Sequence, residues 1–418
     1  MSTRSFNLPL SLLALGLTAA LAAPASAQGS TISFWARNSD ETVITPLVKA
    51  YNARGGTQVK LTIIPFDQFV TKFGTAVAGG AGPDVVAVDL VYLPSFVDAG
   101  QMLDITQQIK ALPFAKTLVQ SHLRLATQNG KTYAVPFTTE GSVLVYNKGL
   151  FKKAGLNPNK PPTTFAEIEA DAKKITALGN GTKGFYFAGA CPGCNAFTFL
   201  PYIWASGGDV LSANGKTATL DTKPVRDALA FYRRLWQGGQ VPAGAKTDNG
   251  SNFFAGFATG KIGMSGLGAF AIAALKASSP NLDFGIAPLP GMNGGHASFA
   301  GGDSIGIPVG SKNTKAAFDF ITWCLSEQVQ VQNFAKSGAL TVRSDLEQNE
   351  YSRKDPRYLI ASKAMQSGRT PLSLKYNELF NDANGPLLAM FQQAIFGTGV
   401  DAAVKTGQAD FTKILNSK

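Results

Sequence analysis

The chain has 418 residues, of which 45% are hydrophobic, enough to build packed cores in two or three domains. Its formal charge of +11 would suit a nucleic-acid-binding protein. The basic residues are scattered in pairs such as Lys152 and Lys153, with no run of four, so we expect no nucleic-acid partner. The charge indicates a basic surface that serves solubility or faces an anionic envelope.

The N-terminus has the features of a secretory signal peptide. Arg4 precedes an apolar run over residues 8–21, and Ala25, Ser26 and Ala27 form a small-x-small cleavage site. The alternative, a transmembrane anchor, is disfavoured because the run is shorter than the roughly 20 residues that a spanning helix needs. We predict that residues 1–27 are removed and that a soluble protein remains in the periplasm or another extracytoplasmic space.

Strand and helix patterns alternate from the start of the mature chain, which favours an α/β architecture over a barrel or a bundle. Short apolar runs typical of strands alternate with segments whose apolar residues recur at helical spacing. In order, we expect a strand at 31–35, a helix over 44–51, a strand at 59–64, a helix over 66–77 and a buried parallel strand at 84–88.

The interior of the chain contains further helix and strand patterns separated by glycine-rich loops. Helices are expected over residues 163–178, with a capping box formed by Thr164 and Glu167, and over residues 225–237. A strand-like run follows at residues 304–309. Because the sequence has no internal repeat and no low-complexity linker, we expect the domains to be interwoven by short crossovers.

Eight segments of the chain are informative when taken in order: residues 82–89, 96–105, 129–136, 144–151, 161–165, 254–264, 299–303 and 338–343. Together they resemble the sugar-binding branch of the extracellular solute-binding proteins, a maltose-binding-protein-like family. Each segment is weak evidence by itself, but their ordered combination spans nearly the whole mature chain.

The resemblance implies an α/β fold of the two-lobed periplasmic binding protein type, class II, with interwoven lobes joined by two or three hinge crossovers. The crossovers would fall near residues 136–139, 300–301 and 340–344. The implied lobes are an N-terminal lobe of residues 28–137 plus 301–343 and a C-terminal lobe of residues 138–300 plus 344–418. Hinge closure around a ligand turns occupancy into a change of shape that a membrane partner can recognise.

Polar and aromatic residues follow two expected strands of the N-terminal lobe, at the sheet edge where open α/β proteins bind ligands. Trp35, Arg37 and Asn38 lie where the first strand turns into a helix, and Asp89 and Tyr92 follow the third strand. A sugar offers apolar ring faces to aromatic side chains and hydroxyls to polar ones. The same pattern also fits structural roles, with Trp35 covering the core and Asp89 capping the next helix.

The resemblance implies further ligand contacts from the C-terminal lobe and the second crossover. Glu140 matches a position whose carboxylate faces the sugar, although a charged residue there could also simply be exposed to solvent. Phe270 matches a stacking aromatic position, with phenylalanine in place of the more usual tryptophan. The remaining implied contacts are Asn195, Phe197, Gly302 and Asp303. The first two rest on a looser match and could instead be structural.

The three cysteines suggest one disulfide and one free thiol. In an oxidising compartment, Cys191 and Cys194 most simply form a short disulfide loop that stiffens the chain. A redox-active pair is the alternative, but the strand and tryptophan context of thioredoxin-like sites is missing. Cys324 lies on an apolar helical face and is expected to be a buried thiol.

We therefore predict a binding protein that captures a mono- or oligosaccharide and delivers it to the transmembrane permease subunits of an ATP-driven importer. We expect it to act as a monomer with no metal or cofactor. The same fold could instead bind a polyamine, a phosphorylated polyol or ferric ion. A secreted glycoside-active enzyme is the alternative of another class. The two histidines, His122 and His296, lie near no cysteine or paired-carboxylate motif.

Overall fold

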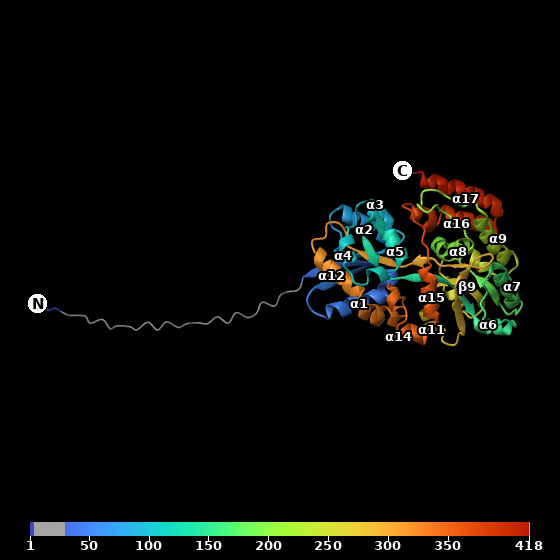
Figure 1. Cartoon of the computed structure of the whole chain (residues 1–418), viewed down its shortest axis with the longest axis horizontal. Coiled ribbons are helices and arrows are strands. Elements are labelled where there is room, and N and C mark those ends of the chain that lie inside the picture. The colour runs from blue at the N-terminus through green and yellow to red at the C-terminus, as the bar shows by residue number, and fades with distance from the viewer. Residues whose placement is uncertain (4–29, 418) are drawn as a thin grey trace.

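The computed structural model describes residues 1–3 and 30–417, so the predicted signal peptide lies outside the described residues, apart from its first three. Figure 1 shows two lobes side by side, one holding α1 to α5 and α12, the other holding α6 to α9, α16 and α17. Within the part of the chain described, no helix is both long and apolar enough to cross a membrane.

The first lobe is built on a five-stranded sheet with the order β2-β1-β3-β14-β6. Strand β1 pairs in parallel with β2 and β3, whereas β14 runs antiparallel between β3 and β6. The carboxyl ends of β1 and β3 therefore lie at the same edge as the start of β14. The strands are β1 Thr31–Arg37, β2 Gln58–Ile64, β3 Val85–Asp89, β6 Ala134–Pro136 and β14 Asp303–Gly306.

Helices cover both faces of this sheet. The predicted apolar stripe of α1 is confirmed, since Ile44, Leu47, Val48 and Tyr51 are all buried. The ring of Phe34 on β1 packs edge to face with Phe137 and Phe320. The helices of this lobe are α1 Glu41–Asn52, α2 Phe66–Ala78, α3 Leu93–Asp98, α4 Thr106–Lys110, α5 Gln120–Ala126, α12 Thr314–Cys324 and α13 Glu327–Val329.

The second lobe is built on a sheet with the order β10-β7-β9-β8, and the short strand β13 also pairs with β7. Strand β7 is antiparallel to β9 and β10, and β8 is parallel to β9. The strands are β7 Glu140–Asn147, β8 Lys183–Tyr186, β9 Ile262–Gly268, β10 Phe284–Ala287 and β13 Ala300–Gly301. Two-stranded hairpins pair β4 Thr127–Gln128 with β5 Lys131–Thr132 and β11 Leu289–Pro290 with β12 His296–Ala297.

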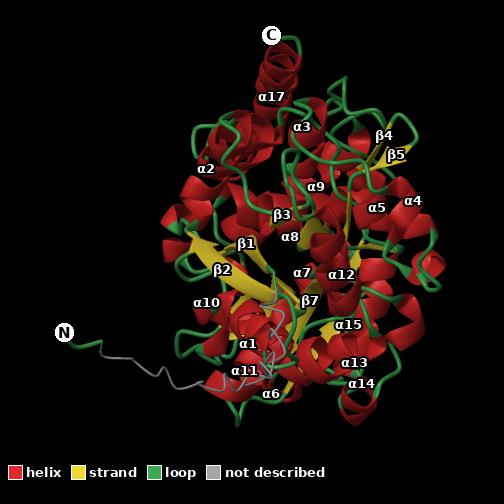
Figure 2. Cartoon of the chain, turned by 90° about the vertical axis from the view of Figure 1, so that its left-hand side faces the viewer, coloured by secondary structure: helices red, strands yellow, loops and turns green. Residues whose placement is uncertain are grey.

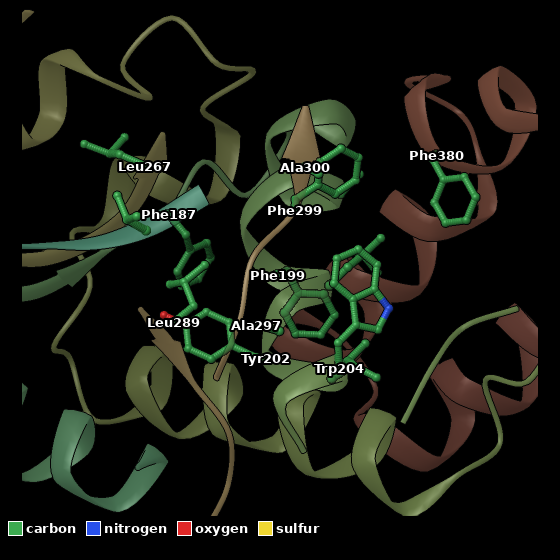
Figure 3. Close-up of a cluster of buried hydrophobic side chains, with 14 of the residues drawn as sticks. Phe187, Phe199, Tyr202, Trp204, Leu267, Leu289, Ala297, Phe299, Ala300 and Phe380 are labelled. Carbon is green, nitrogen blue, oxygen red and sulfur yellow. The ribbon is translucent and has the colours of Figure 1, made fainter. Parts of the chain in front are cut away.

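The core of the second lobe is rich in aromatic rings, as Figure 3 shows for Phe199, Tyr202 and Trp204 of α8 beside Phe299. Trp204 and Phe299 have ring centroids 5.9 Å apart. The helices are α6 Lys148–Lys153, α7 Phe165–Thr176, α8 Pro192–Ala205, α9 Lys223–Gln237, α10 Ala255–Ala258, α11 Phe270–Ser278, α15 Arg357–Gln366, α16 Pro386–Phe396 and α17 Val400–Leu415. Helix α14 Glu350–Lys354 contacts both α15 and the segment Gln330–Ala335 that follows α13.

Two local predictions in this lobe can be compared with the structure. Thr164 caps α7 as expected, accepting a hydrogen bond from the backbone N–H of Glu167. The capping box differs in its second half, because the Glu167 carboxylate accepts from Thr163 rather than from Thr164. Cys191 and Cys194 form the predicted disulfide at the start of α8.

The chain passes between the two sheets through short crossovers that touch each other. The first runs from β6 to β7, and the second runs from β13 to β14. The backbone N–H groups of Phe137 and Thr138 in the first donate to the carbonyl of Asp303 in the second. Gly302 has φ +110°, and a Cβ there would lie 2.3 Å from the Thr138 carbonyl oxygen, so the close approach requires glycine. The residues at which each lobe begins and ends stay a prediction.

Candidate functional site

A charged cluster forms where β1, β3 and β14 meet at the hinge. Arg37 Nη1 lies 2.9 Å from Asp89 Oδ2, and Arg37 Nη2 contacts Asp303 and lies 3.8 Å from Asp40 Oδ2. Asp303 reaches Arg37 because β14 inserts antiparallel beside β3, with Asp303 directly opposite Asp89. The guanidinium also lies over the ring of Phe66, 5.4 Å from its centroid. The guanidinium of Arg37 therefore pairs with three carboxylates.

Burial controls the protonation of this cluster. It raises the pKa of Asp303 to about 7, and it also raises the pKa of Asp89, although the charge of Arg37 opposes both shifts. Burial acts to lower the pKa of Arg37, but Asp303, Asp89 and Asp40 outweigh it and hold the pKa above its ordinary value. Arg37 is thus permanently cationic, only 7% exposed, and engaged by the protein's own carboxylates.

Glu140 opens β7 on the other side of the hinge. Its Oε1 accepts hydrogen bonds from the backbone N–H of Gly141 at 3.1 Å and of Phe270 at 3.3 Å, and Oε2 accepts from Phe270 at 3.2 Å. Burial raises the pKa of Glu140 to about 8 against the effect of these amides, and the charge of Asp40 adds to the rise. The charge of Asp40, on β1's side of the hinge, thus acts on the pKa of Glu140.

Two phenylalanine rings stay exposed beside these polar groups. Phe270, at the start of α11, is 38% exposed and packs obliquely on Phe253 and Phe254, with ring centroids 6.5 and 6.3 Å away. Phe66, at the start of α2, is 45% exposed. In Figure 2, the end of β2, which leads into Phe66, and helix α10, which follows Phe254, both lie on the left of the molecule. Each lobe thus presents an exposed ring, Phe66 beside the Arg37 guanidinium and Phe270 beside Glu140.

Comparison with known proteins decides the family. The family model described as bacterial extracellular solute-binding protein matches residues 37–331, most of the chain. The chain belongs to the bacterial extracellular solute-binding proteins. The family consists of binding proteins, and its match runs through both lobes, from Arg37 past both central crossovers.

Relatives within this family and solved structures agree on the fold. The diacetylchitobiose binding protein of Streptomyces coelicolor is 25% identical over 93% of this chain and 90% of that protein. The GacH receptor of Streptomyces glaucescens, solved unliganded and in complex with acarbose, superposes with a TM-score of 0.79 and 25% identity over 93% of this chain and all of that one. An ABC transporter solute-binding protein from Thermotoga lettingae, bound to α-D-tagatose, has a TM-score of 0.81 and 23% identity over 93% and 100%. The two-lobed fold predicted from the sequence is confirmed.

The structure brings most of the predicted residues of this solute-binding protein to the hinge. Phe197 lies beside Glu140, since a Cβ on Gly301 would be 3.4 Å from the Phe197 ring and 3.7 Å from Glu140 Cβ. Trp35 shares the face of β1 with Arg37 and lies half-buried, with Lys72 Nζ 5.7 Å from its ring centroid. Phe197 and Glu140 thus lie beside the second crossover, and Trp35 lies on the same sheet face as Arg37.

Other predicted residues make bonds within the protein itself instead of lying in a position suited to direct ligand contact. Asn195 is only 1% exposed, and its Nδ2 donates to the Ala188 carbonyl, so α8 buries it behind the site. Asp303 is fully buried and faces Arg37. Asn38 is exposed, but its Oδ1 accepts from the backbone N–H of Phe66 and so holds the start of α2. Gly302 allows the two crossovers to approach each other closely.

Tyr92 connects the first lobe to a segment that the sequence analysis did not single out. Its hydroxyl accepts from Asn381 Nδ2 at 2.8 Å and donates to Asn377 Oδ1 at 3.4 Å. Its ring meets that of Tyr376 edge to face, 6.3 Å apart. No local motif marks these partners, because they lie almost 300 residues further along the chain.

Phe66 was also missed, for a different reason. The helical repeat that predicts α2 includes Phe66 and Val70 together with Phe69 and Phe73, and the pattern does not separate them. In the structure Phe69 and Phe73 are buried, whereas Phe66 and Val70 are exposed. A phenylalanine at the first position of a helix that follows a parallel strand was the available signal.

Proposed function

We propose that this protein captures a mono- or oligosaccharide outside the cell membrane and delivers it to the permease subunits of an ATP-driven importer, without catalysing a reaction. The observation that carries the proposal is that each side of the hinge presents an exposed ring beside polar groups: Phe66 lies beside Arg37, which Asp40 and Asp89 engage, and Phe270 lies beside Glu140. Sugar rings stack on such aromatic faces while their hydroxyls bond to nearby polar groups.

The named ligands of the relatives support a sugar. One relative is a diacetylchitobiose binding protein, and two solved structures hold acarbose and α-D-tagatose. Another is the maltooligosaccharide ABC transporter solute-binding lipoprotein of Streptococcus pneumoniae, which is 26% identical over 72% of this chain and 70% of that protein. These names also support an importer as the partner of this chain.

A phosphorylated polyol is disfavoured by the state of Arg37. Anion recognition requires a guanidinium with free donors, and this one is engaged by Asp89 and Asp303 and is almost fully covered. A polyamine is the second candidate, because the carboxylates of Asp40, Asp89, Asp303 and Glu140 outnumber the one cation among them.

A thermal-shift panel tests the proposal on the mature chain. The panel contains maltose, maltotriose, diacetylchitobiose, tagatose, spermidine and glycerol phosphate. A ligand present at a hundred times its dissociation constant adds about 2.7 kcal/mol to the free energy of unfolding, and so raises the midpoint. We expect at least one sugar to do so. A shift with spermidine or glycerol phosphate beside flat responses to every sugar would refute the sugar assignment.

The absence of catalysis needs its own measurement. Incubation of the same preparation with chromogenic α- and β-glycosides should release no chromophore above a buffer blank. Release that scales with protein concentration and disappears in Glu140→Gln would contradict a purely binding role and favour a glycoside-active enzyme.

A further inference from the structure

The helix that carries Phe270 has no cap of its own. Its N-cap residue is Ala269, which has no side-chain acceptor, so the first amides of α11 need a partner from elsewhere. Glu140 supplies it from β7, since the Phe270 N–H donates to both of its carboxylate oxygens. A carboxylate at this end of a helix is also stabilised by the helix dipole.

A second bond fixes the same junction. The backbone N–H of Ala269 donates to the Gly141 carbonyl at 3.0 Å. The first two residues of β7 therefore hold the last residue before α11 and its first residue by separate hydrogen bonds. Because β7 also pairs with β9, with Ser142 opposite Gly268, the turn between β9 and α11 is fixed at both ends.

The Phe270 ring and the Glu140 carboxylate converge on the space above Gly268. A Cβ at Gly268 would lie 2.6 Å from Phe270 Cδ1 and 2.7 Å from Glu140 Oε1. The ring is otherwise in oblique contact with Phe253 and Phe254 and is partly exposed. Its direction therefore depends on the backbone of the turn, which Glu140 holds.

We propose that Glu140 is a positioning residue that orients the Phe270 ring toward the ligand, rather than a group whose main role is to bind a sugar hydroxyl. The inference rests on the proposed function only for the identity of the ligand. The geometry itself can be measured without any ligand. It assigns to Glu140 a role different from the one that the sequence resemblance implies.

In Glu140→Gln, the side-chain amide should accept the backbone hydrogen bond that the Glu140 carboxylate accepts in the wild type. Its carbonyl oxygen accepts a backbone N–H as a carboxylate does, whereas alanine offers no acceptor. Glu140→Gln should therefore keep the ring in place, and Glu140→Ala should release it. Glu167→Ala is the matched control, because Glu167 also bonds backbone at a helix start, α7 of the same lobe, away from this turn.

The first arm of the test reads the ring directly. Phe270 is replaced by 4-fluorophenylalanine, and ¹⁹F spectra of the ligand-free protein are compared in the three variant backgrounds. We expect Glu140→Ala to shift and broaden the resonance, and Glu140→Gln and Glu167→Ala to leave it unchanged. An unchanged resonance in Glu140→Ala would overturn the proposal. If Glu140→Ala does not fold, Glu140→Asp is tested in its place. Because its shorter side chain cannot reach the Phe270 amide, we expect the same shift and broadening of the resonance, and an unchanged resonance would again overturn the proposal.

The second arm is a double-mutant cycle, with maltotriose and diacetylchitobiose as probes in calorimetric titrations. Glu140→Ala should weaken binding about tenfold in the wild-type background, the scale of a lost stacking contact, and hardly at all once Phe270 is alanine. Equal losses in both backgrounds would show that Glu140 contacts the sugar independently and would overturn the proposal. If neither probe binds any variant while the ¹⁹F arm succeeds, the sugar assignment fails for these probes and the positioning role stands.

Discussion

Replacing Arg37 by methionine should be among the most damaging single changes in the first lobe. The substitution keeps the apolar volume over Phe66 but leaves the fully buried Asp303 without its counter-charge. Breaking a buried ion pair in this way costs about 3–5 kcal/mol. Arg234→Met is the matched control, since its pair with Glu169 is only partly buried and contributes below about 1 kcal/mol.

The loss should depend on pH. Burial raises the pKa of Asp303 to about 7, whereas the pKa of an aspartate in an unfolded chain is about 3.9. The folded protein therefore retains a proton that the unfolded chain has released, and the stability from this group is present below about pH 4 and lost as the pH rises through about 7. Without Arg37 the ionised form loses its main support, so the damage should be greater at pH 8 than at pH 5.

Urea unfolding followed by circular dichroism at the two pH values measures both effects. The double variant Arg37→Met with Asp303→Asn should recover part of the loss at pH 8, because it no longer buries an unpaired charge. If Arg37→Met costs no more than Arg234→Met at pH 8, or costs more at pH 5 than at pH 8, the account of this cluster is wrong.

Three further predictions concern the rings, the lobe contact and the free thiol. Alanine at Phe66 or Phe270 should weaken sugar binding about tenfold in calorimetric titration, because each removes an exposed stacking face; unchanged affinity would exclude that ring from the site. Tyr92→Phe removes the hydroxyl that bonds Asn381 across the lobes, so affinity should fall about fivefold; an equal or higher affinity would contradict a role in closure. Cys324 is fully buried, so a thiol reagent should label no cysteine in the native protein and one in urea; labelling before unfolding would show that its helix opens.

The sequence by itself determined the features that depend on local pattern and on order along the chain. Alternating strand and helix periods indicate an α/β protein, and the segments between residues 82 and 343 resemble one family in the family's order. The short spacing of Cys191 and Cys194, in a chain expected to reach an oxidising compartment, was enough to predict their disulfide, and the apolar stripe around Cys324 was enough to predict its burial. Predicting these features does not require knowing which residues pack against them.

Only the tertiary structure decided which side chains meet. Asp303 reaches Arg37 across 266 positions, because β14 returns antiparallel to the edge where β1 ends. The same return brings Gly301 opposite Glu140, and the start of α11 lies against that carboxylate. Helical periodicity fixes the spacing of apolar residues but not which of them face solvent, so the exposure of Phe66 and the burial of Asn195 depend on the neighbours that each lobe supplies.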